Sequence, residues 1–297
     1  MRTIGIIGAP SSAGAYAPGQ ERAPAALRDV GLLRDLADRG ADVHDRGDTT
    51  PFRWSPDRAS PRAQNVAAAA GTIAAVAESV AAALDAGEVA LVLGGDCTVG
   101  LGAVRALAAT PGYGLLYLDM HSDMNTPAST TDGALDWMGV AHLLGLEDTV
   151  PELVPAEVLQ PAQLSLLGFE ESQATNWERE QLAGLQIATT SAAALIANPG
   201  QAAEQALAAL PPDCARIAVH FDVDVIDFTD APLSQNTGRN VGVPLASALA
   251  SLEALVADPR VATVTVTELN PLHGAADGST LEEFARGLAA AVARWAA

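Results

Sequence analysis

Short runs of apolar residues recur along the chain and alternate with longer segments in which apolar residues repeat at helical spacing. Eight runs are rich in β-branched and aliphatic residues and have the length of strands. These runs are residues 3–9, 41–45, 88–95, 113–120, 163–170, 185–190, 216–225 and 261–270. They lack the strict alternation of a half-buried strand, so we expect strands that are covered on both faces.

The segments between these runs predict helices. Residues 23–40 and 66–87 each carry an apolar face at helical spacing and end at a glycine, a common helix stop. Strands that alternate with helices indicate a parallel sheet with a helical layer on each side. The segment 48–64 is rich in Pro and Ser and predicts an irregular surface excursion, because the alternation resumes beyond it. We therefore predict one α/β domain over residues 1–297.

The charge balance narrows the classes of partner. Acidic residues number 36 against 16 basic residues, and the formal net charge is −20. Nucleic acids and anionic membrane surfaces attract basic patches, so we expect neither as a partner. The charge does not select a substrate.

Cysteine content and apolar segments bear on the compartment. Cys97 and Cys214 are too few for a disulfide framework, which favours a reducing, cytoplasmic environment. Residues 1–10 run directly into an expected strand and lack the cleavage site of a signal peptide. The apolar stretch 71–95 contains three acidic residues, so we predict no transmembrane helix.

Four of the expected strands end in residues that can carry chemistry. The segments are Gly-Gly-Asp-Cys-Thr at 94–98, Asp-Met-His-Ser-Asp at 119–123, Phe-Asp-Val-Asp at 221–224 and Glu-Leu-Asn-Pro at 268–271. The carboxyl ends of parallel strands meet at one edge of a sheet, where ligands bind in open α/β folds. We therefore expect the four segments to form one site.

Carboxylates dominate these segments. Asp119, His121 and Asp123 alternate, so all three side chains lie on one side of an extended chain, and Asp222 and Asp224 repeat the pattern. Like charges in a buried crevice are costly unless a cation compensates them. Carboxylates with an imidazole suit divalent ions such as Mn²⁺, and the set exceeds the needs of one tetrahedral zinc. The pattern favours two bridged ions, with a solvated acid cluster as the alternative.

In order and content the four segments resemble the signature blocks of the arginase/agmatinase family of ureohydrolases. The resemblance covers nearly the whole chain, including residues 19–28. It implies a three-layer αβα arginase-like fold around an eight-stranded, mainly parallel sheet. It also implies two Mn²⁺ ions bridged by a hydroxide, which attacks the carbon of a guanidinium group.

The resemblance assigns functional positions residue by residue. Ligands of the first ion correspond to Asp119, Asp123 and Asp222. Ligands of the second ion correspond to Asp119, His121, Asp222 and Asp224, so that two aspartates bridge. Glu268 corresponds to the acid that binds the guanidinium. Asn125 and Thr130 correspond to residues that contact the amino-acid end of the substrate.

Four departures from the family pattern bear on the chemistry of the site, and a fifth, Phe228 in place of a proline, concerns loop shape. Cys97 replaces a histidine ligand, and we interpret it as a thiolate ligand, with a small buried hydrophobe as the alternative. Asp136 stands where the family has a histidine that shuttles protons. Asp132 replaces a serine that contacts an α-carboxylate, and Gln173 replaces an aspartate that holds an α-ammonium. A carboxylate at position 132 should repel an α-carboxylate, at a cost of several kcal/mol in a desolvated pocket.

We interpret His220 as a support for the ligands and not as a ligand. It points to the same strand face as Asp222 but lies two residues deeper in the expected strand.

Together these features predict a Mn²⁺-dependent hydrolase that splits a C–N bond of a guanidino compound into a urea and an amine. Asp123 would orient the attacking water, Glu268 would pair with the guanidinium, and Asp136 would be the acid or base near the leaving amine. Plain L-arginine is not the expected substrate, and an N-hydroxyguanidine is favoured. The alternatives are a hydrolase of a formimino compound and an inactive metal-binding paralogue. Assemblies in the family vary, so a homo-oligomer is compatible with the sequence.

Overall fold

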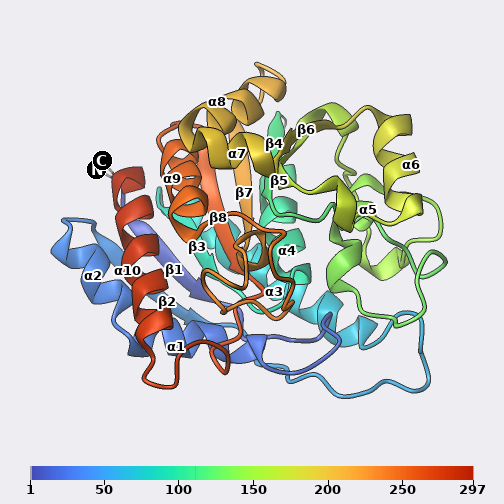
Figure 1. Ribbon diagram of the computed structural model, residues 1–297, viewed down its shortest axis with the longest axis horizontal. Coiled ribbons are helices and arrows are strands. Elements are labelled where there is room, and N and C mark those ends of the chain that lie inside the picture. Colours follow the sequence, from blue (N-terminus) through green and yellow to red (C-terminus); the bar gives the residue numbers. More distant parts are fainter. Residues whose placement is uncertain (1, 111, 297) are drawn as a thin grey trace.

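A computed structural model describes residues 2–110 and 112–296. Its centre is a sheet of eight strands in the order β2-β1-β3-β8-β7-β4-β5-β6, in which every pairing is parallel (Figure 1). The strands are β1 Ile4–Gly8, β2 Val43–Asp48, β3 Val89–Leu93, β4 Tyr113–Leu118, β5 Leu164–Phe169, β6 Ala188–Ser191, β7 Arg216–Asp222 and β8 Val261–Thr267. Each overlaps one of the predicted runs, which confirms the eight-stranded parallel sheet.

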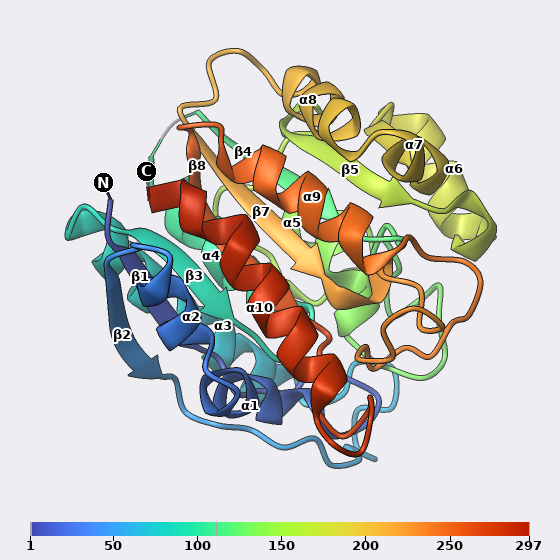
Figure 2. The ribbon, with the colours of Figure 1, turned by 60° about the vertical axis from the view of Figure 1, so that its left-hand side comes forward.

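Helices cover both faces of the sheet. They are α1 Ala23–Asp29, α2 Leu32–Asp38, α3 Val66–Asp85, α4 Thr98–Ala108, α5 Gly139–Leu144, α6 Asn176–Leu185, α7 Ala192–Ala197, α8 Pro199–Ala209, α9 Leu245–Val256 and α10 Ser279–Ala293. One layer contains α1, α2 and α7 to α10, and α9 and α10 lie across the face of the sheet in Figure 2. The other layer contains α3, α4 and α5. This arrangement confirms the predicted αβα architecture.

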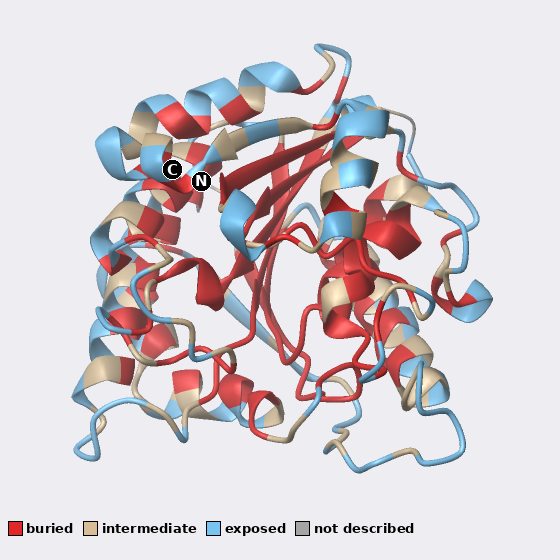
Figure 3. Cartoon of the chain, turned by 45° about the vertical axis from the view of Figure 1, so that its right-hand side comes forward, coloured by how far each residue is buried: buried red, intermediate tan, exposed pale blue. Residues whose placement is uncertain are grey.

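Side chains of β7 alternate between the two layers. Ile217, Val219 and Phe221 belong to the core beneath α9 and α10. His220 faces the opposite layer, because its ring lies against Gly100 of α4. Figure 3 shows the central strands buried between the two layers. The face that carries His220 also carries Asp222, since side chains two apart share a face.

Two glycines link β3 to α4 because the backbone passes close to its neighbours there. A Cβ atom on Gly95 would overlap the carbonyl oxygen of Ser11, and one on Gly94 would lie 2.7 Å from that of Val266. The close passage brings Cys97 to the start of α4, at the carboxyl edge of the sheet. Any larger residue at position 95 must displace backbone.

Replacing Gly95 by alanine is expected to lower the free energy of unfolding by about 1–3 kcal/mol or more, the usual cost of overpacking. Gly71 is the matched control, because it lies inside α3 and a Cβ atom on it would meet nothing within 4 Å. Gly71→Ala should raise stability by about 0.5–1 kcal/mol, the difference in helix propensity. Urea unfolding of both variants measures the effects, and equal stabilities would contradict the packing argument.

One of two further predicted segments differs in detail from the structure. Residues 23–40 form two helices, because Gly31 has a positive φ of 94° and ends the first before the second begins. Residues 49–64 contain no helix or strand beyond an isolated bridge between Ser11 and Phe52, which agrees with the predicted irregular excursion.

One helix in the described part of the chain, α3, has the length and hydropathy of a membrane span. Over an 18-residue window this helix has a mean hydropathy of 1.6, so its length and composition suffice for a membrane span. A core helix of an αβα protein meets the same criterion. In the structure α3 packs on α4 and buries Ile73, Val76 and Val80. The buried apolar side chains of α3 therefore pack within the helical layer.

Candidate metal centre

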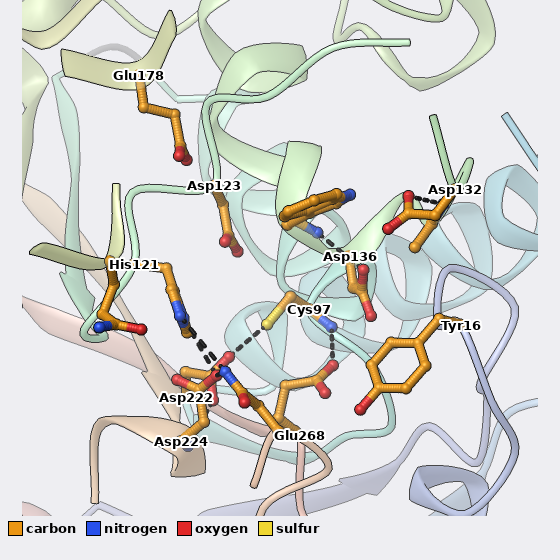
Figure 4. A pocket seen from close by; sticks show the side chains of 14 residues that line it. Tyr16, Cys97, His121, Asp123, Asp132, Asp136, Glu178, Asp222, Asp224 and Glu268 are labelled. Atoms are coloured by element: carbon orange, nitrogen blue, oxygen red, sulfur yellow. Dashed lines mark hydrogen bonds and ion pairs between the residues drawn. The ribbon is translucent and has the colours of Figure 1, made fainter. Parts of the chain in front are cut away.

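A cavity of about 260 Å³ opens at the carboxyl edge of the central strands. It is lined by Tyr16, Cys97, His121, Asp123, Asp132, Ala134, Asp136, Trp137, Gln173, Glu178, Asp222, Asp224, Asn236 and Glu268. Figure 4 shows the acidic side chains converging from several segments around Cys97. Among the described residues, no arginine lines it. The cavity is thus an acidic pocket built by residues from both halves of the chain.

The first group of ligand-type side chains lies at the base of the cavity. Cys97, Asp119, His220 and Asp222 each place one ligand-type atom within 4.8 Å of the others, and all four are buried. The Cys97 thiol donates to Oδ2 of Asp222 at 2.7 Å. This group includes His220, for which the sequence pattern predicts only a supporting role.

The second group shares Asp119 with the first. Asp119, His121 and Asp224 place their ligand-type atoms within 4.8 Å of one another. Nδ1 of His121 lies 3.1 Å from Oδ2 of Asp224 and 3.4 Å from Oδ1 of Asp119. Two groups joined by one carboxylate have the layout of a site for two ions.

Buried oxygen atoms without partners fit a cation. Among the described residues, Oδ2 of Asp119 and Oδ1 of Asp224 are buried and have no hydrogen-bond partner. Buried carboxylate oxygens are costly when they are unpaired, whereas a divalent ion satisfies them. The donor set therefore fits the metal ions that the sequence pattern indicates.

Without a cation, burial raises the pKa of most acids in the cluster, whereas the neighbouring His121 holds the pKa of Asp224 below its usual range. Burial raises the pKa of Asp119 to about 7, with Asp224 adding to the effect. Burial and the neighbouring Asp224 and Asp119 raise the pKa of Asp222 well above its usual range. Burial and Asp222 likewise raise the pKa of the Cys97 thiol. Cation binding must therefore displace protons from this cluster.

Asp123 lies beside these groups and not within either of them. It lines the cavity, and its Oδ2 accepts a hydrogen bond from the hydroxyl of Tyr117 at 2.5 Å. Its backbone has a φ of 50°, a conformation that non-glycine residues adopt rarely. Such conformations persist where the surrounding structure enforces them, often at functional sites.

Glu268 is the second acid with an uncommon backbone, at a φ of 62°. Its Oε2 accepts from Nε2 of Gln20 at 2.9 Å, and its Oε1 accepts from the backbone N–H of Cys97 at 3.1 Å. Burial, with Asp96 nearby, raises its pKa well above the usual range. The carboxyl group is thus fixed in position at the cavity wall.

Asp136 occupies the position at which the sequence departs from the family's shuttle histidine. It is buried and lines the cavity, and its Oδ1 accepts from the N–H of Trp137 at 3.0 Å. Burial, followed by Glu268 and Asp96, raises its pKa well above the usual range. A carboxyl group with a raised pKa is a better proton donor near neutrality than an ordinary aspartate.

The residues expected at the far end of the substrate are divided between rim and interior. Asp132 and Gln173 line the cavity and are exposed. Water screens an exposed charge, so the expected penalty of several kcal/mol for a carboxylate at position 132 is too large. Asn125 and Thr130 are buried and do not line the cavity. Oδ1 of Asn125 instead accepts from Thr175 at 3.2 Å.

Glu178, Asn236 and Tyr16 are among the lining residues that the sequence pattern did not indicate. Glu178 forms a capping box with Thr175 at the start of α6, and the Thr-x-x-Glu spacing could have indicated its helix but not its place in the cavity. Asn236 places Nδ2 3.4 Å from Oδ2 of Asp224. Tyr16 is 49% exposed at the rim and donates to the carbonyl oxygen of Gln235. No local motif marks the last two residues.

Comparisons with known proteins agree on one family. A family model described as "Arginase family" matches residues 2–294. An arginase from Glaciozyma antarctica is 30% identical over 286 residues, which cover 92% of this chain and 82% of that protein. Arginase-1 from Homo sapiens is 36% identical over 162 residues, which cover 51% of this chain and 48% of that protein. The human match thus spans about half of the relative's length.

Solved structures share the fold at lower identity. The arginase from Bacillus subtilis has a TM-score of 0.83 and 23% identity, and the match covers 97% of this chain and 98% of that one. The formimidoylglutamase from Bacillus subtilis subsp. subtilis str. 168 has a TM-score of 0.75 and 18% identity, over 99% of this chain and 88% of that one. At these identities the likeness establishes the fold alone.

Proposed function

The chain belongs to the arginase family, and from that premise we propose that it is a hydrolase of amidino compounds that uses two divalent metal ions. The observation that carries the proposal is the pair of ligand groups that share Asp119. They adjoin a cavity that also contains Glu268 and Asp136. Carboxylates and imidazole favour Mn²⁺ as the ion. When bound, such ions neutralise the carboxylates and lower the pKa of a water molecule so that it is nucleophilic at neutral pH.

Glu268 is proposed to bind the amidino group of the substrate. Gln20 and the backbone N–H of Cys97 each hold one oxygen of its carboxylate. A guanidinium next to this buried carboxyl would favour its ionised form, because an opposite charge lowers a carboxyl pKa. The pairing would orient the C–N bond toward the metal ligands.

Asp123 and Asp136 are proposed to handle protons. The hydroxyl of Tyr117 holds one oxygen of Asp123, which fixes the carboxylate where it can accept a hydrogen bond from the attacking water. Asp136 has a raised pKa, so it can protonate the leaving amine. A histidine is better matched to proton transfer at neutrality, because its ordinary pKa is about 6.5.

We favour an N-hydroxyguanidine as the substrate class. With Cys97 as a thiolate, five anionic side chains face two dications, whereas a histidine at that position would leave four. The additional negative charge lowers the Lewis acidity of the ions. A weakly basic hydroxyguanidine requires less proton transfer than an alkylguanidine, so it is less affected by this change and by the loss of the shuttle histidine.

A substrate screen tests this proposal. Protein reconstituted with Mn²⁺ is expected to release a urea or hydroxyurea from a hydroxyguanidino compound and to turn over L-arginine with much lower kcat/KM. Colorimetric urea detection with mass spectrometry of the amine product measures both. Efficient turnover of L-arginine would contradict the substrate assignment and leave the metal proposal standing.

The two positions at which the site departs from the family pattern, Cys97 and Asp136, can be changed to histidine by mutation. Cys97→His, alone and combined with Asp136→His, is expected to shift preference from the hydroxyguanidine toward the guanidine by about tenfold or more, which corresponds to about 1.4 kcal/mol. The pH profile of the double variant should also follow a histidine. Unchanged metal content, pH profile and preference in both variants would show that Cys97 is a bystander.

A formimino compound is the second candidate substrate, and the structural likeness to a formimidoylglutamase favours it over other imidamides. Its products differ, because hydrolysis releases formamide or ammonia and no urea. Nitrogen product analysis on both substrate classes decides between them. An inactive metal-binding paralogue would bind two ions and turn over neither class.

We also propose a reducing, cytoplasmic environment for the protein. Cys97 and Cys214 are both free and buried. A thiolate ligand must remain reduced to bind metal, and oxidation would remove it. Loss of metal on mild oxidation, reversed by a reductant, is the expected behaviour.

A further inference from the structure

His220 lies directly beneath the metal ligands on the same face of the sheet. Its ring stacks on that of Tyr117, its neighbour on β4, with centroids 4.2 Å apart and planes 2° apart. Nε2 lies 3.1 Å from Oγ1 of Thr267, which in turn lies 3.5 Å from Sγ of Cys97. The imidazole is 2% exposed and reaches the base of the cluster.

The packing around His220 leaves one polar atom unsatisfied. Among the described residues, Nδ1 has no hydrogen-bond partner although it is buried. A Cβ atom on Gly100 would overlap Nδ1, so α4 accommodates the ring only because residue 100 is glycine. A buried imidazole with an incomplete set of partners is costly in an apolar core. Nδ1 lies against α4, whereas Nε2 lies on the side of Thr267 and Cys97, so a cation held with Cys97 could use the imidazole as a ligand.

The separation of the candidate atoms fits one ion. Ligands at 2.0–2.3 Å from a common centre in a tetrahedron lie about 3.3–3.8 Å apart. One nitrogen of His220 and one ligand-type atom each of Cys97, Asp119 and Asp222 already lie within 4.8 Å of one another. Asp123 is not in this group, and its Oδ2 accepts a hydrogen bond from the hydroxyl of Tyr117.

We propose that His220 is a ligand of the ion that Cys97 binds. This ion then has a thiolate, an imidazole and two carboxylates, and the imidazole absent at position 97 is supplied from β7. Thiolate and imidazole are softer ligands than carboxylates and favour Zn²⁺ or Co²⁺ over Mn²⁺. The group of Asp119, His121 and Asp224 retains the preference for Mn²⁺. The two sites of this chain therefore differ in the metal ion that they prefer.

This inference rests on the metal-binding part of the proposed function and is independent of the substrate. It also revises two sequence interpretations: His220 becomes a ligand, and Asp123 acts only on the water. If neither Zn²⁺ nor Mn²⁺ binds to the wild-type protein, both the proposed function and the inference fail. If two ions bind and His220 is untouched, the inference alone fails.

Nitrogen-15 NMR of histidine-labelled protein gives a direct test, because the chain has 5 histidines. On titration with Zn²⁺, one ring nitrogen of His220 is expected to move to the shift of a metal-bound imidazole, and His220→Gln assigns the signal. His142 is the internal control. It is also a buried imidazole, but Nδ1 contacts the carbonyl oxygen of Met138 and Nε2 accepts from the N–H of Val150. Its signals should not change.

Zinc affinity provides a second measurement. Loss of a residue that only orients a ligand typically weakens metal binding about 10–100-fold, so His220→Gln is expected to exceed that range at the Cys97 site. Thr267→Val is the matched variant, because it removes the hydroxyl between His220 and Cys97 and leaves the imidazole. Its loss of affinity should stay within the range of about 10–100-fold. Unchanged His220 signals at saturating Zn²⁺, or equal losses in the two variants, would overturn the proposal.

Should His220→Gln fail to fold, the wild-type protein alone still decides the question. Loading with ¹¹³Cd²⁺, a soft substitute for Zn²⁺, should produce scalar coupling between the cadmium and a ring nitrogen of His220. Coupling to His121 alone would overturn the proposal.

Discussion

Replacing Asp222 by asparagine is expected to remove most of the bound metal and to lower kcat/KM by about 10²-fold or more, since breaking a buried charged set typically costs about 3–5 kcal/mol. Asp222 contacts the cluster through both oxygens: Oδ2 accepts from the Cys97 thiol at 2.7 Å, and Oδ1 accepts from the N–H of Asp224 at 2.6 Å. Asparagine keeps the size of the side chain and cannot neutralise a cation. Elemental analysis should find close to two ions per wild-type chain and fewer than one in the variant.

Asp258→Asn is the matched control for this experiment. Asp258 is paired with Arg260 at 2.8 Å and precedes β8, at the opposite edge of the sheet from the cavity. Its replacement should leave metal content and kcat/KM unchanged. Cys97→Ser should lose less metal than Asp222→Asn if Asp222 bridges the ions. Full metal occupancy in Asp222→Asn would contradict the ligand assignment.

Metal-free protein is expected to lose stability as the pH rises from about 4 to 7, the range between the ordinary and the folded pKa of Asp119. The raised pKa of Asp119 favours folding while its carboxyl group is protonated in both the folded and the unfolded protein. This contribution to stability is lost as the pH rises through the pKa of the folded state. A shift from 3.8 to about 7 corresponds to about 4 kcal/mol for this residue. Asp123, Asp222 and Glu268 act in the same direction.

Comparison with Asp119→Asn isolates this effect, because asparagine cannot ionise. Metal-free wild type and variant should have similar melting temperatures near pH 4, and the variant should be the more stable protein near pH 8. Saturating metal should reverse the order at pH 8, since only the ionised wild-type site binds a cation well. If the difference in melting temperature between the metal-free wild type and the variant were the same at every pH, the electrostatic explanation would be refuted.

The elements and the place of the site could be predicted because both depend on local patterns. Apolar runs such as residues 88–95 have no polar alternation, and the acids follow those runs directly, so topology alone gathers them at one edge. The break at Gly31 could not be predicted with the same method. A glycine there permits a positive φ, but whether the chain uses it depends on the packing of α2 against α10.

The features that could not be predicted from the sequence depend on contacts between residues that are far apart in the chain. His220 differs from an ordinary buried histidine only through Gly100 and Tyr117, which lie on other elements. The exposure of Asp132 likewise depends on how its loop crosses the rim. Neither property leaves a periodic signal in the sequence. The uncommon backbone of Asp123 is also invisible there, since aspartate is frequent in many other turns.

The strand order places the last strands of the chain in the middle of the sheet. β1, β2 and β3 form one block and β4, β5 and β6 another, and β7 and β8 lie between them. Cys97 and Asp222 are consequently 125 residues apart in sequence, and Cys97 and Glu268 are 171 apart. During synthesis the two blocks can form before the strands that join them exist, and such distant pairings are slow to form. We therefore expect metal uptake to be a late step in the maturation of the nascent chain, after β7 and β8 have entered the gap.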